Sequence, residues 1–462
     1  MTKKKYDRKP RFQRLYAGLL GKALAAALAV AALQLTVCAA TVTLAPPSGT
    51  STNVLALYAG ETSVEIAGPG TVSLNPANTY TGGTTLSGGM LAYSGTYHDG
   101  VSPLGSGTLS IANEDAVVSG SGTIANNISA TQIVNFAPEG TIALSGDNAI
   151  SGALKVLANT LEIAGGTTTA DGISLAPSGG TAHFRQSGGT VTLGANLQLS
   201  PVKGITSSYT MTGGTLDLQK EYKILMYGNG GSGASVSTLD VSGDAVIKNV
   251  SVLYINKNFS KLTDSSFTIN VHDGGRLGFY TTAYSSASTV IGEAFTVDGG
   301  ILANDYAKGS SRTEREWIDS VASIAVGPKG ATFTTDNGNK AGMAQIKCPV
   351  TAVAAEPGET AKGVAFDGGQ WEFMATGNAY EGPTVIKNEA VLFLDASGTI
   401  PSTSTVSRFR QRTLHRRRKQ DRLRSGSRKR RHPRLRHQFI DALYTDRHRL
   451  ARTPGLREDR AV

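Results

Sequence analysis

The chain has 462 residues, of which 40% are hydrophobic, 6% are aromatic and 55 are glycine, a composition that favours short strands joined by tight turns. Its net charge of +10 averages three unlike parts. Residues 1–22 carry eight Lys or Arg and one acid, residues 408–462 carry twenty and five, and residues 23–407 carry 17 basic and 29 acidic residues. Because its body is acidic, we expect no nucleic-acid partner for residues 41–406.

Residues 1–40 predict a secretory signal peptide. A basic segment is followed by an apolar run from Ala23 to Val37 and by small residues that end at Ala40. The run is shorter than the ~20 residues that span a bilayer, so we expect recognition by the inner-membrane secretion machinery and cleavage after Ala40. The alternative is lipidation at Cys38, as in a lipoprotein, but the β-branched Val37 directly before it disfavours such a site.

The chain has two cysteines, Cys38 and Cys348. After cleavage at Ala40 the mature body would keep Cys348 alone and could form no disulfide within the chain. This is unusual for a protein exported to an oxidising compartment.

The region after Ala40 changes from a linker to a strand pattern. Residues 41–60, with Pro46 and Pro47, predict an entry linker. From about Leu55 apolar and polar residues alternate in short runs, as in Val64-Glu65-Ile66. Such alternation predicts short strands with one buried face.

One motif occurs three times at fixed internal spacing, which indicates a repeat architecture. Each copy has an Asn, an apolar residue two places after it, a Gly four places after it and a buried-type aliphatic residue 13 places after it. The copies are NTYTGGTTLSGGMLAY (78–93), NAISGALKVLANTLEI (148–163) and NAYEGPTVIKNEAVLF (378–393).

This motif resembles the autotransporter-associated β-strand repeat, also called the passenger-associated transport repeat, whose usual form is N-x-Y-x-G-x-T followed by G-x-L. The resemblance implies an autotransporter passenger domain, secreted or displayed at the cell surface in association with the outer membrane. Adhesion is the commonest role in that class. It gives no ligand, so the expected partner is an unidentified surface glycan or protein.

A second signature, apolar residues flanking Gly-Gly, divides the middle of the chain into coils. It reads YTMTGGTL from Tyr209 and FTVDGGIL from Phe295, and Gly pairs begin at positions 188, 213, 274 and 299. The first and last of these intervals are equal, and a degenerate copy at Gly243 divides the longer middle one almost in half. These spacings predict one right-handed parallel β-solenoid over residues 41–406 with Gly-Gly bends. We expect inward side chains at Leu91, Leu161, Leu216, Leu302 and Val391.

Two other structures compete with the solenoid. A flexible Gly-rich linker would lack the apolar residues that recur at fixed offsets. An array of β-sandwich domains would need repeats much longer than the interval from Gly188 to Gly213.

One insert departs from the strand pattern. Residues 310–326 read SSRTEREWIDSVASIAV, and Ser311 followed by Glu314 predicts a capping box that opens a short helix.

The same insert supports the rival function, a glycan-cleaving β-helix enzyme. Paired carboxylates are needed for glycoside hydrolysis, and an aromatic side chain can stack on a sugar. A mixed charge run on a short helix is more simply a solvated face, so we expect no enzyme. The residues concerned are Glu314, Glu316, Asp319 and Trp317.

The body contains no recognisable catalytic, cofactor or metal motif. Its histidines, His98, His183 and His272, lie in no zinc-ligand spacing. No nucleophile elbow or P-loop is present either. We therefore predict no catalytic, cofactor-binding or metal-binding residue, and we interpret the protein as an adhesin-like interaction protein, with a purely structural cell-envelope protein as a further alternative.

Residues 407–462 differ abruptly from the body and predict a frameshift near codon 407. Residues 23–407 contain 13 Lys and 4 Arg, whereas residues 408–462 contain 18 Arg, 2 Lys and four His. An autotransporter needs a C-terminal β-barrel, and this chain shows no strand pattern for one. Arg codons have G as second base, so a frame one base later would encode Gly, Ala, Val, Asp or Glu. The chain would then be a truncated passenger confined to the periplasm.

Sequencing of the gene around and beyond codon 407 tests this prediction. We expect the shifted frame to stay open and to continue the Gly-rich strand pattern towards a barrel. Stop codons within a few dozen triplets would instead favour the alternative, a genuine disordered basic arm.

Overall fold

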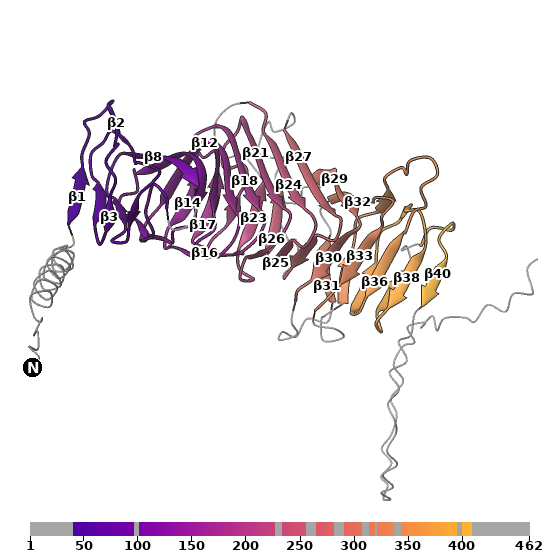
Figure 1. Cartoon of the computed structure of the whole chain (residues 1–462). Coiled ribbons are helices and arrows are strands. Elements are labelled where there is room, and N and C mark those ends of the chain that lie inside the picture. The colour runs from indigo at the N-terminus through magenta and orange to yellow at the C-terminus, as the bar shows by residue number, and fades with distance from the viewer. Residues whose placement is uncertain are drawn as a thin grey trace, which may run out of the picture. The chain divides into compact units, whose positions relative to one another are not determined.

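The computed structural model describes residues 40–96, 101–226, 233–255, 265–280, 291–306, 314–318, 321–336, 343–394 and 400–408. Within these ranges the regular structure consists of strands, with no α-helix. The strands pair in parallel with strands one coil away, and they follow one another in chain order along the stack (Figure 1). The chain is therefore a parallel β-solenoid, which confirms the fold class expected from the repeats.

The first sheet contributes one side to every coil and has 16 strands. In spatial order these are β1 (Thr41–Leu44), β4 (Ser63–Ile66), β7 (Thr84–Leu86), β9 (Leu109–Ile111), β11 (Ile128–Ala130), β13 (Asn148–Ile150), β16 (Thr167–Ala170), β19 (Thr190–Leu193), β22 (Thr215–Asp217), β25 (Val246–Val250), β28 (Arg276–Phe279), β30 (Gly300–Asn304), β33 (Ala331–Thr334), β36 (Val364–Asp367), β38 (Thr384–Lys387) and β40 (Val406–Arg408).

The second sheet begins on the next side of the coil. It contains β2 (Ser51–Asn53), β5 (Thr71–Ser73), β8 (Met90–Thr96), β10 (Val117–Ile124), β12 (Val134–Leu144), β14 (Ala153–Val156), β17 (Gly172–Leu175), β20 (Leu197–Gln198), β23 (Lys223–Met226) and β26 (Val252–Ile255).

The third sheet branches from the second at β12. The first part of β12 pairs with β14, whereas its last four residues pair with β15. From there to β27, each coil contributes one strand to each of the three sheets. The third sheet contains β15 (Asn159–Ile163), β18 (Gly180–Gln186), β21 (Ile205–Met211), β24 (Val236–Val241), β27 (Ser266–His272), β29 (Ile291–Asp298), β32 (Val321–Val326) and β35 (Val350–Ala352).

Two short sheets complete the stack. One pairs two strands near the start of the chain and the other pairs four strands near its end. They contain β3 (Ala59–Gly60) and β6 (Thr79–Tyr80), and β31 (Glu314–Ile318), β34 (Met343–Ile346), β37 (Gln370–Phe373) and β39 (Val391–Leu394).

The Gly-Gly spacing correctly predicted the coil lengths in the middle of the chain. In the first sheet Val191 pairs with Leu216, and Leu216 pairs with Ile247 in the next coil. The following partners in this column are Leu277 and Leu302. The number of residues between successive partners in this column equals the number between successive Gly-Gly copies, to within one residue. The degenerate Gly243 copy therefore marks a full coil.

The glycine bends confirm the steric reason for that signature. Gly189 has a φ of +65°, and a Cβ there would lie 2.6 Å from the carbonyl oxygen of Gly166 in the preceding coil. A Cβ at Gly213 would lie 2.5 Å from the carbonyl oxygen of Ser187. Both positions therefore exclude any larger residue without movement of the backbone.

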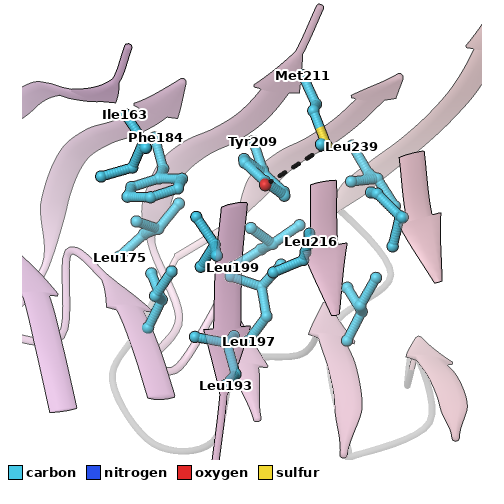
Figure 2. Close-up of a cluster of buried hydrophobic side chains, with 14 of the residues drawn as sticks. Ile163, Leu175, Phe184, Leu193, Leu197, Leu199, Tyr209, Met211, Leu216 and Leu239 are labelled. Atoms are coloured by element: carbon cyan, nitrogen blue, oxygen red, sulfur yellow. Dashed lines mark hydrogen bonds between the residues drawn. The ribbon is translucent and has the colours of Figure 1, made fainter. Parts of the chain in front are cut away.

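Apolar columns fill the interior of the coils. In the third sheet Leu161 pairs with Phe184, which pairs with Tyr209, and all three side chains are buried. The rings of Phe184 and Tyr209 lie 5.2 Å apart, and leucines from the other sides of the coil pack around them (Figure 2). Each fully buried leucine contributes on the order of 2 kcal/mol of transfer free energy. Leu91, Leu161, Leu216 and Leu302 are buried as expected.

The expectation for Val391 is wrong, because this side chain is 36% exposed. The residue that faces the core column is Leu392, which pairs with the buried Trp371. The turn before β39 contains two consecutive residues with positive φ, Asn388 and Glu389. From the core-packed Ile386 to Leu392 the chain advances six places, whereas it advances five from Leu86 to Leu91, so the alternation shifts by one place.

Two further expectations are corrected. Residues 41–60 are no linker, because β1 pairs along its whole length with β4 and starts the first sheet. The predicted helix after Ser311 is also wrong, since Glu314–Ile318 forms β31 and pairs with β34. Backbone hydrogen bonds to the next coil outweigh the local capping preference here.

Two of the three motif copies occupy equivalent positions. Asn78 accepts a hydrogen bond from the backbone N–H of Tyr58 in the preceding coil (2.9 Å), and Asn378 accepts one from that of Val350 (2.8 Å). Two residues later a buried tyrosine hydroxyl bonds to a threonine hydroxyl, in the pairs Tyr80–Thr84 and Tyr380–Thr384, both at 2.6 Å. Burial raises the pKa of Tyr80 to about 12.

The middle copy lies one side later in the coil. Asn148 belongs to the first sheet, where it pairs with Ile128 and donates a hydrogen bond to the buried Thr168 hydroxyl (2.9 Å). Its Leu161 lies in the third sheet, whereas Leu91 lies in the second. The shared spacing of this copy therefore does not reflect a shared position.

Replacing Leu161 with Asp tests the inward columns. The change buries an unpaired carboxylate, so we expect it to lower the free energy of unfolding by at least about 4 kcal/mol in chemical denaturation. Thr169→Asp, on an exposed outward position, is the matched control and should change it by less than about 1 kcal/mol. Equal effects of the two variants would contradict the assigned register.

Candidate binding surface

The outward side of the first sheet from β1 to β22 carries a regular array of polar side chains. Successive partners such as Ala149, Thr169 and Thr192 lie in one column across the strands. Of fourteen outward strand positions, eleven are Ser or Thr. We call these fourteen residues the hydroxyl face: Thr41, Thr43, Ser63, Glu65, Thr85, Ser110, Ser129, Ala149, Thr167, Thr169, Thr190, Thr192, Thr215 and Asp217.

Local sequence explains this arrangement. Thr-x-Thr in a strand puts both hydroxyl groups on one side, because successive side chains point to opposite faces. Thr167 and Thr169 are exposed, whereas Thr168 between them is buried. Threonine is β-branched and favours strands, so the exposed positions support the fold as well as displaying hydroxyl groups.

Hydrogen bonds between coils hold several of these side chains in place. The hydroxyl groups of Thr41 and Ser63 lie 2.9 Å apart. The hydroxyl of Thr43 donates to Glu65 at 3.3 Å. Asp147, which precedes β13, accepts bonds from both the backbone N–H and the hydroxyl of Thr167, each at 2.8 Å. These two bonds lower the pKa of Asp147.

Charge is unevenly distributed along the solenoid. Residues 40–154 contain no Lys or Arg and seven acids. Among the described residues, the basic side chains on the outward side of the first sheet are Lys248, Arg276 and Lys387. Each of them forms an ion pair with an aspartate. The first half of the hydroxyl face is therefore uniformly negative or neutral.

A buried carboxylate, Asp305, lies beyond the hydroxyl face, directly after β30. The Asp305 side chain is buried, with the residue 8% exposed. Its carboxylate forms an ion pair with the Arg276 guanidinium (2.5 Å) and accepts a hydrogen bond from the backbone N–H of Asn249 (2.8 Å). The Asp305 side chain passes over Gly278, in the coil between Asp305 and Asn249. Only glycine leaves room for it there, because a Cβ at Gly278 would lie 2.6 Å from the Asp305 Cγ. Burial raises the pKa of Asp305, and the charge of Arg276 only partly offsets this shift.

The histidines lie elsewhere. His183 and Ser208 form a hydrogen bond of 2.8 Å on the third sheet. His272 lies between Asp273 (2.8 Å) and Asp240 (3.2 Å). Burial lowers the pKa of His272, but its bonds to the two aspartates outweigh burial and the net shift is upward. The bonds of His183 to Ser208 and of His272 to Asp240 link neighbouring coils. His98 lies outside the described residues.

The carboxylates considered for glycan cleavage are only partly placed. Glu314 and Glu316 belong to β31, a strand, and Asp319 lies outside the described residues. In the part of the chain that the structure describes, no group of three or more His, Cys, Asp or Glu is arranged to hold a metal ion. No helix among the same residues is long and apolar enough to cross a membrane.

The position of the hydroxyl face was not predicted from the sequence. The signal was available in the pairs Thr167/Thr169 and Thr190/Thr192, which occupy matching places on neighbouring strands and face the same way. No sequence pattern predicts that Glu65 and Asp217 belong to this face, because their positions on it depend on the strand register.

Comparison of the chain with protein-family models, with curated proteins and with solved structures finds no match.

Proposed function

We propose that the protein is a secreted or surface-displayed interaction protein of the autotransporter-passenger type, which binds a surface glycan or protein through the hydroxyl face. The observation that carries this proposal is the array of eleven exposed or half-exposed Ser and Thr side chains on one sheet. A scaffold alone does not require this uniformity, since many other residues are compatible with exposed strand positions.

The geometry of the face suits many weak contacts. Each hydroxyl can donate one hydrogen bond and accept others. Strands lie about 4.8 Å apart, so the nine strands from β1 to β22 cover roughly 40 Å along the stack. A long partner could contact several coils at once, and linked contacts raise the total affinity well above that of one contact.

Two features support the autotransporter type. The equivalent roles of Asn78 and Asn378 give a physical basis to the motif that resembles the passenger repeat. The signal peptide predicted before Ala40 would direct export, which a surface-displayed binding protein requires. We therefore place the function in binding rather than in glycan cleavage.

Binding to arrays of glycans and host-cell proteins tests this function. We expect the full chain to show saturable binding to at least one ligand. The variant T167V/T169V/T190V/T192V, which removes four hydroxyl groups but keeps β-branched residues, should lose at least about tenfold in affinity. The matched control is T160V/T206V/T210V/T238V on the third sheet, and it should bind as the parent does. No saturable binding by the parent, or equal loss in both variants, would favour a structural spacer.

A further inference from the structure

Three carboxylates lie on or beside the hydroxyl face, at successive separations of four and three strands. Glu65 lies in β4, Asp147 directly precedes β13, and Asp217 ends β22. Glu65 also accepts a hydrogen bond from the Ser87 hydroxyl at 3.0 Å. Asp217 accepts bonds from the side chain of Asn249 and the backbone of Gln219. Burial raises the pKa of Asp217, but these bonds and nearby Lys248 outweigh burial and the net shift is downward. These acids are thus held in fixed directions along the face.

The charge around two of these acids is not balanced by cations. No Lys or Arg occurs from residue 40 to residue 154, so neither Glu65 nor Asp147 has a basic neighbour within that stretch. Asp217 differs, because Lys248 lies 3.3 Å from it. A negative surface of this kind attracts a partner of positive charge and repels anionic polymers such as sulfated glycans or nucleic acid.

From this arrangement, and on the basis of the function proposed above, we propose that the partner of the hydroxyl face is an amino-sugar polymer with free ammonium groups. Such a polymer carries both hydroxyl and ammonium groups, and the hydroxyl face can form hydrogen bonds with each kind. Its hydroxyl groups can form hydrogen bonds with the Ser and Thr side chains, and its ammonium groups can pair with the carboxylates of Glu65 and Asp147. Ammonium-to-carboxylate hydrogen bonds are stronger than neutral ones, so the charged groups fix the register of the chain.

The periodicity favours a glycan over a basic peptide. Coils repeat about every 4.8 Å, which is close to the length of one sugar unit in an extended chain, so one unit can face each coil. The ammonium group of an amino sugar is fixed to a rigid ring. A lysine side chain must instead lose rotamer freedom on binding, at a cost of about 1 kcal/mol for each ordered side chain.

The test uses the full chain and two ligands of equal length, oligomers of glucosamine and of N-acetylglucosamine, which differ in charge at the nitrogen. In calorimetry or surface plasmon resonance at low salt, we expect the glucosamine oligomer to bind at least about tenfold more tightly, with affinity falling steeply towards about 1 M salt. The variant E65Q/D147N should weaken this binding by at least about threefold. The matched control E356Q/E359Q removes the same charge from an exposed segment between β35 and β36 and should leave binding unchanged.

Three results would overturn the inference. Equal binding of both oligomers would keep a glycan-binding function but remove the role of charge. Binding of poly-lysine without binding of glucosamine oligomers would identify a basic protein as the partner. Equal loss in E65Q/D147N and E356Q/E359Q would show attraction to the overall charge of the chain rather than to the face. Failure of the proposed function itself differs from all three, since no ligand on the arrays would then bind saturably.

Discussion

Parallel backbone hydrogen bonding between residues one coil apart is the interaction on which the rest of the structure depends. It places residues such as Leu161, Phe184 and Tyr209 directly above one another. Every column must therefore keep one character over many coils, apolar inside and polar outside. The same constraint determines where glycines occur, because bends of successive coils are also stacked and a Cβ at Gly189 would collide with the carbonyl oxygen of Gly166. The interior columns and the hydroxyl face are two results of one register.

Polar groups inside the coils show how the register is fixed where apolar packing alone would allow slippage. Gln186 is fully buried, accepts the Tyr209 hydroxyl at 2.6 Å and donates to the backbone carbonyl of Thr215 at 3.0 Å. Burial raises the pKa of Tyr209, so its hydroxyl stays protonated as a donor. Asn78 joins the coils before and after it through Tyr58 and Pro103. A one-residue shift would leave these groups buried without partners, which is costly.

Period-two alternation and Gly-Gly spacing were sufficient to predict the fold and the inward side of Leu91, Leu161, Leu216 and Leu302. Predictions failed where they depended on a turn or on a local preference. Val391 faces outward because the inward residues on either side of the preceding turn lie six places apart instead of five, a difference that the spacing from Asn378 does not reveal. The segment after Ser311 has a helix-start pattern but forms β31, because its neighbours in the stack offer backbone partners. The place of the hydroxyl face depended on register, which no single motif specifies.

The register of the first sheet creates the hydroxyl face, and spin labels at Thr169 and Thr192 test this register most directly. These two positions are partners in the first sheet, on neighbouring strands about 4.8 Å apart. After replacement of Cys38 and Cys348, nitroxide labels on T169C/T192C should give an electron paramagnetic resonance spectrum strongly broadened by spin–spin interaction. Labels on T169C/T210C, which lie on different sheets, should give a much less broadened spectrum. A T169C/T192C spectrum no broader than the sum of its single-label spectra would contradict the register, and with it the hydroxyl face.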